Sequence, residues 1–589
     1  MGPHRQGFGR EGRLGSMKSE ALPAAQALPD SRGINLYSAD PSFAGLLGLY
    51  LSEDLRRHLA PHFNRLGALA GSELDQLAAT ADRNPPELHH RTRSGEERQW
   101  IEKHPAYRRL EEVAFSEYGL AAMSHRGGVL GWPEPLPPAV KYALTYLYVQ
   151  AEFGVCCPLS MTDSLTRTLR KFGDPALVAR YLPGLIEQDF DALTQGSMFM
   201  TEQGAGSDVG GVVTRAVPDA EAWRLYGDKW FCSNADAGLA MVLARPDGAP
   251  GGTKGLALFL LPRVLPDGSA NSYRVVRLKE KLGTRDMPSG EIVLEGARAY
   301  LVGDAARGFV QMTDMINMSR LSNGMRAAGM MRRSLTEALF IARHRVAFGK
   351  PLIELPLMRR QLLKIMLAAE AARSVMFQAA AELEKADAGD ESARRRIRIL
   401  TPLLKFRACR DARRATGDAM EVRGGCGYIE EWSDPRLVRD AHLGSIWEGT
   451  SNVVALDVMR AIRREGALEA LQPALEVMLP QGAFGDALRA AVARASAFAR
   501  ETATRRDDTH ARQAATALYY ATAATVLASE GSRLAATGDA RRLLLSALVL
   551  EHRLTPRDPL ERGAEDRFAD ALLSEAPVSH DLVNQFLKK

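Results

Sequence analysis

The sequence predicts an α+β fold in which helical regions flank a central antiparallel β domain and a further helical region follows. Apolar residues recur at steps of three and four before about residue 195 and again after about residue 309. Between residues 196 and 308 they form short alternating or β-branched runs, separated by Gly, Pro, Asp and Asn. A chain of 589 residues is also too long for one core, so we expect several domains.

The first half of the chain divides where these patterns change. Residues 1–41 form an N-terminal extension that we expect to be partly disordered, because its start is rich in Gly and Arg without periodicity. Residues 42–195 are predicted to form an N-terminal α-helical domain. Residues 196–308 are predicted to form the β domain. The expected strands lie near residues 241–243, 256–260, 273–276 and 291–294.

Helical patterns return in the second half. Residues 309–464 are predicted to form a C-terminal helical bundle, since the apolar stripe from Met358 to Ala369 suits helix packing. Residues 465–589 are Ala- and Leu-rich and are predicted to form an accessory α-helical region.

Composition narrows the class of protein. The formal charge of +5 is small for this length, so charge alone indicates neither nucleic acid nor an anionic membrane as partner. Five cysteines without CxxC spacing predict neither disulfides nor a metal site, and they fit a reducing cytoplasm. No apolar run approaches 18 residues and no signal core precedes the helices. We therefore expect a soluble cytoplasmic protein without a membrane span.

Glu448 is the candidate catalytic base. It lies between Trp447 and Gly449. A carboxylate against a large ring loses hydration, so its pKa rises and it takes a proton from carbon more readily. For an isolated string of this kind, a core ring beside a helix-capping surface acid is the commoner arrangement. The accompanying segments favour the catalytic interpretation.

Those segments carry a resemblance to a known family. They are 200–208, 231–234, 281–285, 345–350, 439–441 and 445–452. In this order and spacing the chain resembles the acyl-CoA dehydrogenase family from about residue 100 to 460. Within it, the chain is most similar to the AidB-like branch, flavoproteins of the bacterial adaptive response to DNA alkylation. Three features indicate this branch. Trp447 stands where most members carry Tyr, and the branch is also similar in residues 198–202 and in the N-terminal segments 35–37 and 84–86.

The resemblance implies a bound FAD. The positions that match the family's cofactor contacts are Met200, Thr201, Gly206, Ser207, Phe231, Cys232, Ser233, Arg345, Gly424, Gly425, Thr450 and Asn452. Phe231 stands where the family often has Trp, which leaves stacking possible over a smaller area. Arg345 and the two glycines match positions that reach the FAD of a neighbouring subunit, so a homotetramer is implied. A plain turn remains an alternative for both glycine-rich segments.

The resemblance also implies the reaction. Glu448 would remove the α proton of an acyl-CoA thioester while hydride passes from the β carbon to FAD. Ser207, Arg320 and Gly449 match substrate-side positions, and an electron-transfer flavoprotein is a typical electron acceptor. A helix-surface ion pair is an equally good interpretation of Arg320, and a turn is one of Gly449.

A DNA-associated role is the alternative. Residues 394–414 include nine Lys or Arg residues and only one acid. Of these, Arg407, Arg410 and Arg414 lie on one helical face. A solvated face or subunit contact is the commoner explanation. Residues 465–589 hold fifteen basic and seventeen acidic residues, a poor counterion-release surface. Enzymatic oxidation therefore ranks above weak duplex DNA binding. A flavin scaffold without efficient thioester turnover is the third possibility.

Overall fold

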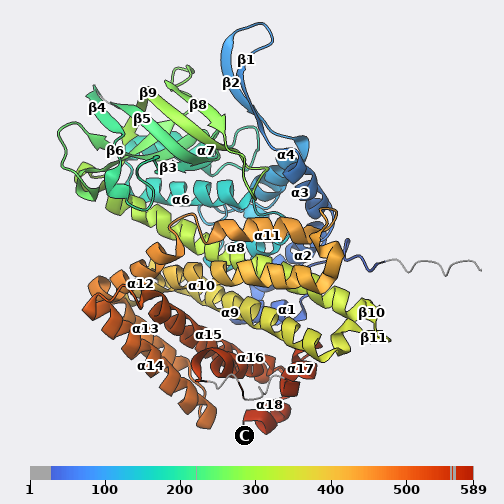
Figure 1. The fold of residues 1–589 in the computed structure, drawn as a ribbon. Coiled ribbons are helices and arrows are strands. Elements are labelled where there is room, and N and C mark those ends of the chain that lie inside the picture. Colours follow the sequence, from blue (N-terminus) through green and yellow to red (C-terminus); the bar gives the residue numbers. More distant parts are fainter. Residues whose placement is uncertain (1–27, 221, 557–559, 561–565, 588–589) are drawn as a thin grey trace, which may run out of the picture.

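The computed structural model describes residues 28–220, 222–556, 560 and 566–587. The part of the extension before residue 28, where disorder was expected, lies outside the described residues. The molecule has three tiers (Figure 1): a β domain, a central helical layer and a tier of accessory helices at the opposite end. The predicted α+β fold is confirmed.

The N-terminal region is mainly helical. Its helices are α1 (Pro41–Tyr50), α2 (Glu53–Ala70), α3 (Glu73–Arg83), α4 (Pro105–Glu111), α5 (Pro138–Tyr148), α6 (Cys156–Phe172) and α7 (Pro175–Leu185). Asp174 begins α7 as an N-cap, because its carboxylate accepts from the amides of Ala176 and Leu177. Helix α6 is buried along nearly its whole length, which places it between the β domain and the helical layer (Figure 1).

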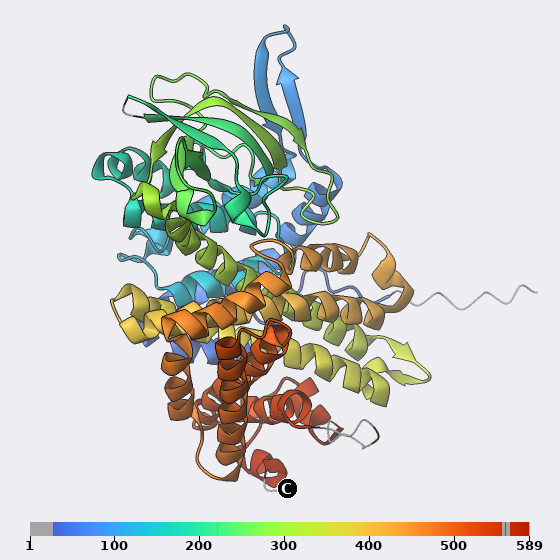
Figure 2. The same cartoon turned by 60° about the vertical axis from the view of Figure 1, so that its left-hand side comes forward.

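A β-hairpin interrupts this region, contrary to the all-helical prediction. Strands β1 (Glu87–Arg91) and β2 (Glu97–Glu102) pair antiparallel and project away from the helices (Figures 1 and 2). Gln99 anchors the hairpin to the β domain, since its side chain bonds the Val275 amide at 3.0 Å and carbonyl at 2.9 Å. The segment is mostly charged and largely exposed, so it lacks the apolar alternation by which strands are recognised.

The β domain contains seven strands. They are β3 (Gly196–Phe199), β4 (Arg215–Asp219), β5 (Ala222–Ser233), β6 (Leu239–Pro246), β7 (Ala257–Pro262), β8 (Tyr273–Leu278) and β9 (Ser289–Leu301). The four predicted strand segments fall within β6 to β9. The pairing is mostly antiparallel, but β6 runs parallel to both β3 and β4, which corrects the purely antiparallel expectation. Parallel pairs need long connections, and a whole hairpin separates β3 from β6.

Five long helices form the bundle. They are α8 (Gly308–His344), α9 (Pro356–Asp387), α10 (Glu391–Arg423), α11 (Ser433–Gly444) and α12 (Ser451–Glu465), with the short hairpin of β10 (Val346–Ala347) and β11 (Lys350–Pro351) after α8. Helix α8 is buried on nearly all sides because α6, α9 and α10 enclose it. It therefore forms the axis along which site residues are arranged.

The accessory tier packs on the bundle mainly through one helix. It comprises α13 (Ala467–Met478), α14 (Ala483–Arg505), α15 (Ala511–Ala535), α16 (Arg541–Val549), α17 (Asp566–Leu573) and α18 (His580–Leu587). Helix α15 lies against α9, α10 and α12, and Figure 2 shows the tier from a second side. None of the described helices is long and apolar enough to cross a lipid bilayer.

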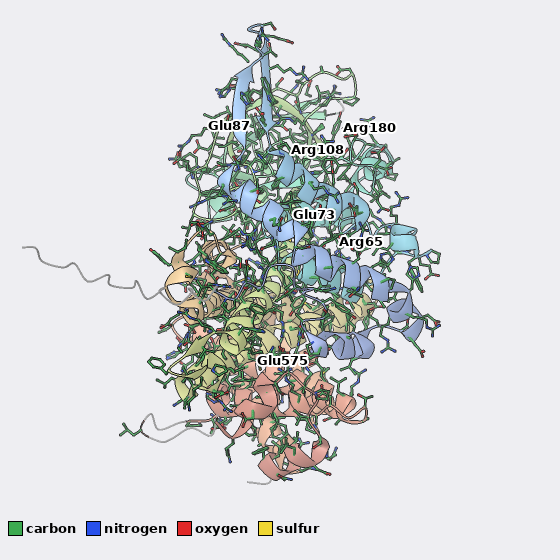
Figure 3. All side chains as sticks on the ribbon, turned by 90° about the vertical axis from the view of Figure 1, so that its right-hand side faces the viewer. Arg65, Glu73, Glu87, Arg108, Arg180 and Glu575 are labelled. Atoms are coloured by element: carbon green, nitrogen blue, oxygen red, sulfur yellow. The ribbon has the colours of Figure 1, made fainter. Side chains whose placement is uncertain are left out.

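Buried ion pairs join this tier to the rest of the molecule. Arg542 of α16 bonds Glu370 of α9 and Glu530 of α15, each at 2.8 Å. Glu575, labelled in Figure 3, pairs with Arg332 of α8 at 2.8 Å. Because a buried charge left alone is strongly destabilising, these pairs tie the tier to the bundle.

Candidate active site

Glu448 lies in the turn between α11 and α12, in a strained backbone conformation. Its φ is +55° and that of Gly449 is +94°. A non-glycine residue in this region costs about 1–3 kcal/mol, so the surroundings must hold it. Two cationic side chains do so. Arg320 Nε of α8 donates to the Glu448 carbonyl at 2.9 Å, and Lys405 Nζ of α10 donates to the Gly449 carbonyl.

Arg320 forms an ion pair, although not on the surface. Its Nη1 lies 2.8 Å from Asp457 of α12, and both side chains are mostly buried. Asp457 also binds Arg398 at 2.8 Å. Arg320 therefore forms an ion pair, as one interpretation of the sequence expected, but the pair is buried and does not lie on the helix surface. Arg320 couples that pair to the backbone of the candidate base.

The carboxyl group of Glu448 has an unused acceptor. Its Oε2 is buried and accepts no hydrogen bond from any residue that the structure describes. Burial raises the pKa of Glu448, and the positive charges of Arg320, Lys405 and Arg326 oppose the rise. Thr450, not Glu448, is the N-cap residue of α12, so Glu448 is not a helix-capping acid. The group is placed to exchange a proton.

The flavin-loop candidates gather around a buried ion pair. Glu202 binds Lys229 at 2.7 Å and accepts from the amides of Val213 and Thr214 at 2.7 and 3.1 Å. These bonds fold the segment that contains Met200, Thr201, Gly206 and Ser207. Gly206 borders open space and Ser207 is exposed, so a ligand can approach the backbone there.

Strand β5 separates its three candidates onto two faces. Successive side chains of a strand alternate. Phe231, 56% exposed, and Ser233 therefore share one face, whereas Cys232 is fully buried in the β core. Cys232 can meet a cofactor only through its backbone. The sequence could not show which face of β5 was the inner one.

Cys157 of α6 connects this face with Glu448. Burial raises the pKa of its thiol to about 11; the charge of Glu448 adds to the rise, and a hydrogen bond with Ser233 opposes it. Ser233 and Glu448 thus both act on one thiol, although about 215 residues separate them along the chain. Cys157 was not predicted as a site residue.

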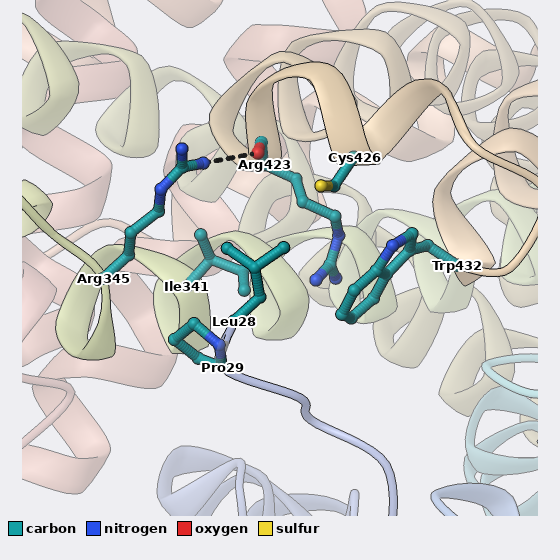
Figure 4. A pocket seen from close by; sticks show the side chains of 7 residues that line it. All are labelled: Leu28, Pro29, Ile341, Arg345, Arg423, Cys426 and Trp432. Carbon is teal, nitrogen blue, oxygen red and sulfur yellow. Dashed lines mark hydrogen bonds between the residues drawn. The ribbon is translucent and has the colours of Figure 1, made fainter. Parts of the chain in front are cut away.

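Arg345, Gly424 and Gly425 form a second location. Figure 4 shows Arg345 donating to the Arg423 carbonyl at 2.8 Å, beside a small hollow that Leu28 and Pro29 partly cover. A Cβ on Gly424 would meet Arg345 at 3.3 Å, whereas Gly425 borders open space. Arg345 follows Arg320 by 25 residues at the far end of α8, about 37 Å along a straight helix. One chain therefore does not bring Arg345 to Glu448.

Thr450 and Asn452 lie at the N-terminus of α12, among arginines that were not predicted as cofactor residues. Both are exposed. Arg512 of α15 donates to Asn452 at 3.5 Å, Arg410 to Ser451 at 3.4 Å and Arg413 to Ser445 at 3.3 Å. A helix N-terminus beside several guanidinium groups attracts anions. Arg512 is 60 residues from Asn452 in the sequence, so only the folded structure shows that the two are close.

Much of the basic run from Arg394 to Arg414 is neutralised within the chain. Arg396 and Arg398 pair with acids of α9 and α12. Arg407 binds Asp411, and Lys405 is buried under Gly449. Arg414, with 71% of its side chain exposed, lies 3.5 Å from Asp418. The run is mainly an internal set of contacts.

Family models match most of the chain. The AidB N-terminal domain model of the adaptive response protein matches residues 27–192. The acyl-CoA dehydrogenase middle-domain model matches residues 197–297, and the C-terminal-domain model matches residues 306–463. Together with the site geometry, these matches define a protein with the acyl-CoA dehydrogenase fold.

Relatives extend the comparison. Acyl-CoA dehydrogenase family member 11 of Caenorhabditis elegans is 32% identical over 76% of this chain and 73% of its own length. The putative acyl-CoA dehydrogenase AidB of Escherichia coli is 33% identical, over 70% and 74%. The structure of C. elegans ACDH-11 with C11-CoA superposes with a TM-score of 0.83 at 28% identity, covering 92% of this chain and 95% of that one. The chain belongs to the acyl-CoA dehydrogenase family and carries the AidB-type N-terminal domain, as the sequence motifs predicted.

Proposed function

We propose that this protein is an FAD-dependent acyl-CoA dehydrogenase that oxidises the α,β bond of an acyl-CoA thioester, with Glu448 as the base. The observation that carries the proposal is the buried, unpartnered carboxyl oxygen of Glu448 at a turn held by Arg320 and Lys405. In the reaction the carboxylate takes the α proton, hydride leaves the β carbon, and a carbon–carbon double bond forms. A carboxylate with a raised pKa is a stronger base than an exposed one.

The residues around the site fit FAD. Phe231 offers an exposed ring for stacking, Ser233 lies on the same strand face, and Gly206 leaves its backbone open. The α12 N-terminus, with Thr450 and Asn452, suits the negative charge of a pyrophosphate. FAD, when bound, supplies the hydride acceptor. We propose that an electron-transfer flavoprotein then reoxidises it.

The turn also offers a donor for the thioester carbonyl. No described residue accepts a hydrogen bond from the Glu448 amide, while the carbonyls of Glu448 and Gly449 are both used. The positive φ of Gly449 requires glycine there. Arg320 acts as a positioning residue because it touches the Glu448 backbone, and Ser207 lies exposed near the flavin loop as a substrate-side candidate.

The distance between Glu448 and Arg345 supports a multi-subunit site. If Arg345, Gly424 and Gly425 bind FAD, they bind that of another subunit, and we propose a homotetramer. Large apolar side chains are exposed close to these residues in the chain, including Phe348 (89%) and Tyr428 (81%). We propose that these two side chains belong to the subunit contact, since both lie close in the chain to the residues that would reach the second FAD.

Glu448→Gln tests the proposal. An amide cannot accept the α proton at neutral pH but keeps a similar size. The variant should retain FAD and its circular dichroism spectrum, yet lose roughly 10²–10⁴-fold in the rate of anaerobic flavin bleaching by acyl-CoA esters. Glu391→Gln, an exposed acid on α10, is the control and should bleach normally. Bleaching of Glu448→Gln at the parental rate would assign the base to another residue.

A further inference from the structure

Helix α8 carries a stripe of buried polar side chains that leads away from Glu448. Ser319, Asn323 and Arg326 are spaced four and three residues apart, so they share one helix face. Their residue exposures are 0%, 1% and 0%. Ser319 directly precedes Arg320, whose Nε donates to the Glu448 carbonyl at 2.9 Å, so the stripe starts at the turn that holds the candidate base.

These side chains have unused hydrogen-bonding groups. Ser319 Oγ, Asn323 Nδ2 and Oδ1, and Arg326 Nη1 are buried and make no hydrogen bond with any residue in the described part of the chain. Trp447 Nε1 and Glu448 Oε2 are likewise buried and make no hydrogen bond with a described residue. Each unsatisfied buried polar group costs about 1–3 kcal/mol, and native proteins leave only a few per hundred residues. So many in one neighbourhood indicate a ligand site with polar walls.

Arg326 is the charged member of this stripe. Its guanidinium carbon lies 4.8 Å from the Trp447 ring centre and 5.3 Å from that of Phe153. It forms no ion pair with any described residue, and its Nε makes one long contact of 3.4 Å with the Ser322 carbonyl. Stacking on two rings contributes about 2 kcal/mol, less than the several kcal/mol that burying an unpaired ion costs. The cation is therefore suited to an anionic partner from outside the chain.

Two other buried arginines on α8 show the contrast. Arg332 pairs with Asp40 and Glu575 at 3.2 and 2.8 Å, and Arg333 with Asp75 and Glu337 at 3.3 and 2.8 Å. Both arginines therefore have a structural role, because their charges are paired within the chain. Arg326 alone of the three faces the rings next to the candidate base.

The position of Arg326 suits the far end of a substrate chain. Seven residues separate it from Ser319, about 10.5 Å along the helix axis. Long side chains on a helix point back toward its N-terminus, so the guanidinium lies closer to Glu448 than its Cα does. Its guanidinium also packs on the ring of Trp447, the residue directly before Glu448.

We infer that Arg326 and Asn323 bind a carboxylate at the distal end of the acyl chain, so that the preferred substrates are CoA thioesters of dicarboxylic acids. This inference rests on the proposed acyl-CoA dehydrogenase function. A carboxylate satisfies the guanidinium and the Asn323 amide together. An alkyl chain of equal length leaves both buried and unpaired, and sites of this kind discriminate strongly against such analogues.

Binding to the FAD-loaded Glu448→Gln protein tests the inference without turnover. Calorimetry would compare glutaryl-CoA, pentanoyl-CoA and the methyl ester of glutaryl-CoA, which share a chain length up to the terminal group. Glutaryl-CoA should bind at least tenfold more tightly than pentanoyl-CoA, and the methyl ester should lie between them. In Glu448→Gln/Arg326→Met the preference should vanish or reverse. Arg326→Lys should restore part of it.

Thermal melting separates recognition from a structural role. Arg326→Met should melt no lower than the parent, because it removes an unpaired buried charge. Arg332→Met is the matched control and should melt clearly lower, because it removes one of the two arginines that pair with each of the buried acids Asp40 and Glu575. If Arg326→Met melted as low as Arg332→Met with unchanged ligand preference, Arg326 would be structural and the inference would be wrong.

The two proposals fail in different ways. If alkyl and dicarboxylic esters bound equally to the parent and to Arg326→Met, the inference would fall while the dehydrogenase function stood. If no CoA ester bound and none bleached the flavin, both would fall together.

Discussion

Glu448 shows how distant residues can hold one strained residue in place. Its carbonyl and that of Gly449 are held by Arg320 of α8 and Lys405 of α10, which are far from it in sequence. Burial raises the pKa of Glu448, which is the direction that the sequence predicted from the neighbouring Trp447. The contacts of Arg320 and Lys405 with this turn could not be predicted, because nothing local to residues 447–449 specifies which side chains meet them.

Arg345 offers a test of the cofactor site at the scale of one residue. Arg345→Ala should weaken FAD retention about 10- to 100-fold, because a charge-assisted hydrogen bond contributes about 1.5–3 kcal/mol. The melting temperature of the apo protein should change little, since the side chain bonds only one backbone carbonyl among the described residues. FAD affinity would be measured by fluorescence titration.

The exposed Arg394 is the matched control for this variant. Among the described residues it pairs only with Glu391, so Arg394→Ala should keep parental FAD affinity. Equal affinity in Arg345→Ala and the parent would remove Arg345 from the list of ligands.

At the scale of elements, a buried acid joins a loop of the β domain to α11. Asp440 accepts the Thr284 amide at 2.7 Å. Burial raises the pKa of Asp440 to about 7; the Thr284 amide opposes the rise, whereas Asp286 and Asp82 add to it. The folded protein therefore retains a proton that the unfolded chain releases near pH 4. Stability from this group is present below that pH and falls as pH rises toward 7.

Asp440→Asn tests this linkage. The amide can still accept from Thr284 but cannot ionise. The stability of Asp440→Asn relative to the parent should therefore increase between pH 5 and pH 8, by on the order of 2–3 kcal/mol. Urea denaturation at each pH measures the difference. For the exposed Asp486→Asn the same difference should stay flat, and a flat result for Asp440→Asn would contradict the raised pKa.

The β10–β11 hairpin gives a test of assembly. Phe348 has a φ of +54° and Gly349 one of +76°, a turn in which Asn is better tolerated than Phe. Phe348→Asn should preserve or raise monomer stability while it weakens assembly and FAD retention. Light scattering after gel filtration measures the change in mass.

An exposed apolar residue elsewhere provides the comparison. Val477 of α13 is 87% exposed, and Val477→Asn should leave assembly unchanged. Unchanged mass in Phe348→Asn would show that this hairpin lies outside the subunit contacts.

Element patterns explain which parts of the fold could be predicted. Strands β6 and β7 are continuous apolar runs, and α9 and α15 carry regular stripes, so residue type specified them. The β1–β2 hairpin depends instead on Gln99 binding the Val275 backbone, a tertiary contact that no local pattern encodes. Arg326 was overlooked because its significance lies in having no acidic partner among the described residues, and partners are visible only in the folded molecule.

At the scale of the whole molecule, charge pairing bears on the DNA-associated alternative. Since Arg396, Arg398 and Arg407 are paired internally, few cations of the basic run remain for phosphates. Duplex binding should be weak at physiological salt and sequence-independent. An Arg407, Arg410 and Arg414 triple Ala variant should lower the salt slope by about one unit for each lost phosphate contact.

A salt series with parent and variant separates the two functions. Tight parental binding at physiological salt that collapses in the variant, with mass and flavin content unchanged, would make DNA association the primary function. An Arg489, Arg494 and Arg500 triple Ala variant of α14 controls for removal of three surface charges.

The buried ion pairs between the accessory tier and the bundle also constrain the order in which the protein can be made. The Arg332–Glu575 and Glu370–Arg542 pairs join residues 243 and 172 positions apart, so one partner of each pair is synthesised well before the other. Until then Glu370 lacks its Arg542 partner and Arg332 its Glu575 partner, so the interior of α8 and α9 cannot close dry. A nascent chain that stalls after α12 would thus keep a hydrated, protease-sensitive centre until the accessory helices are made.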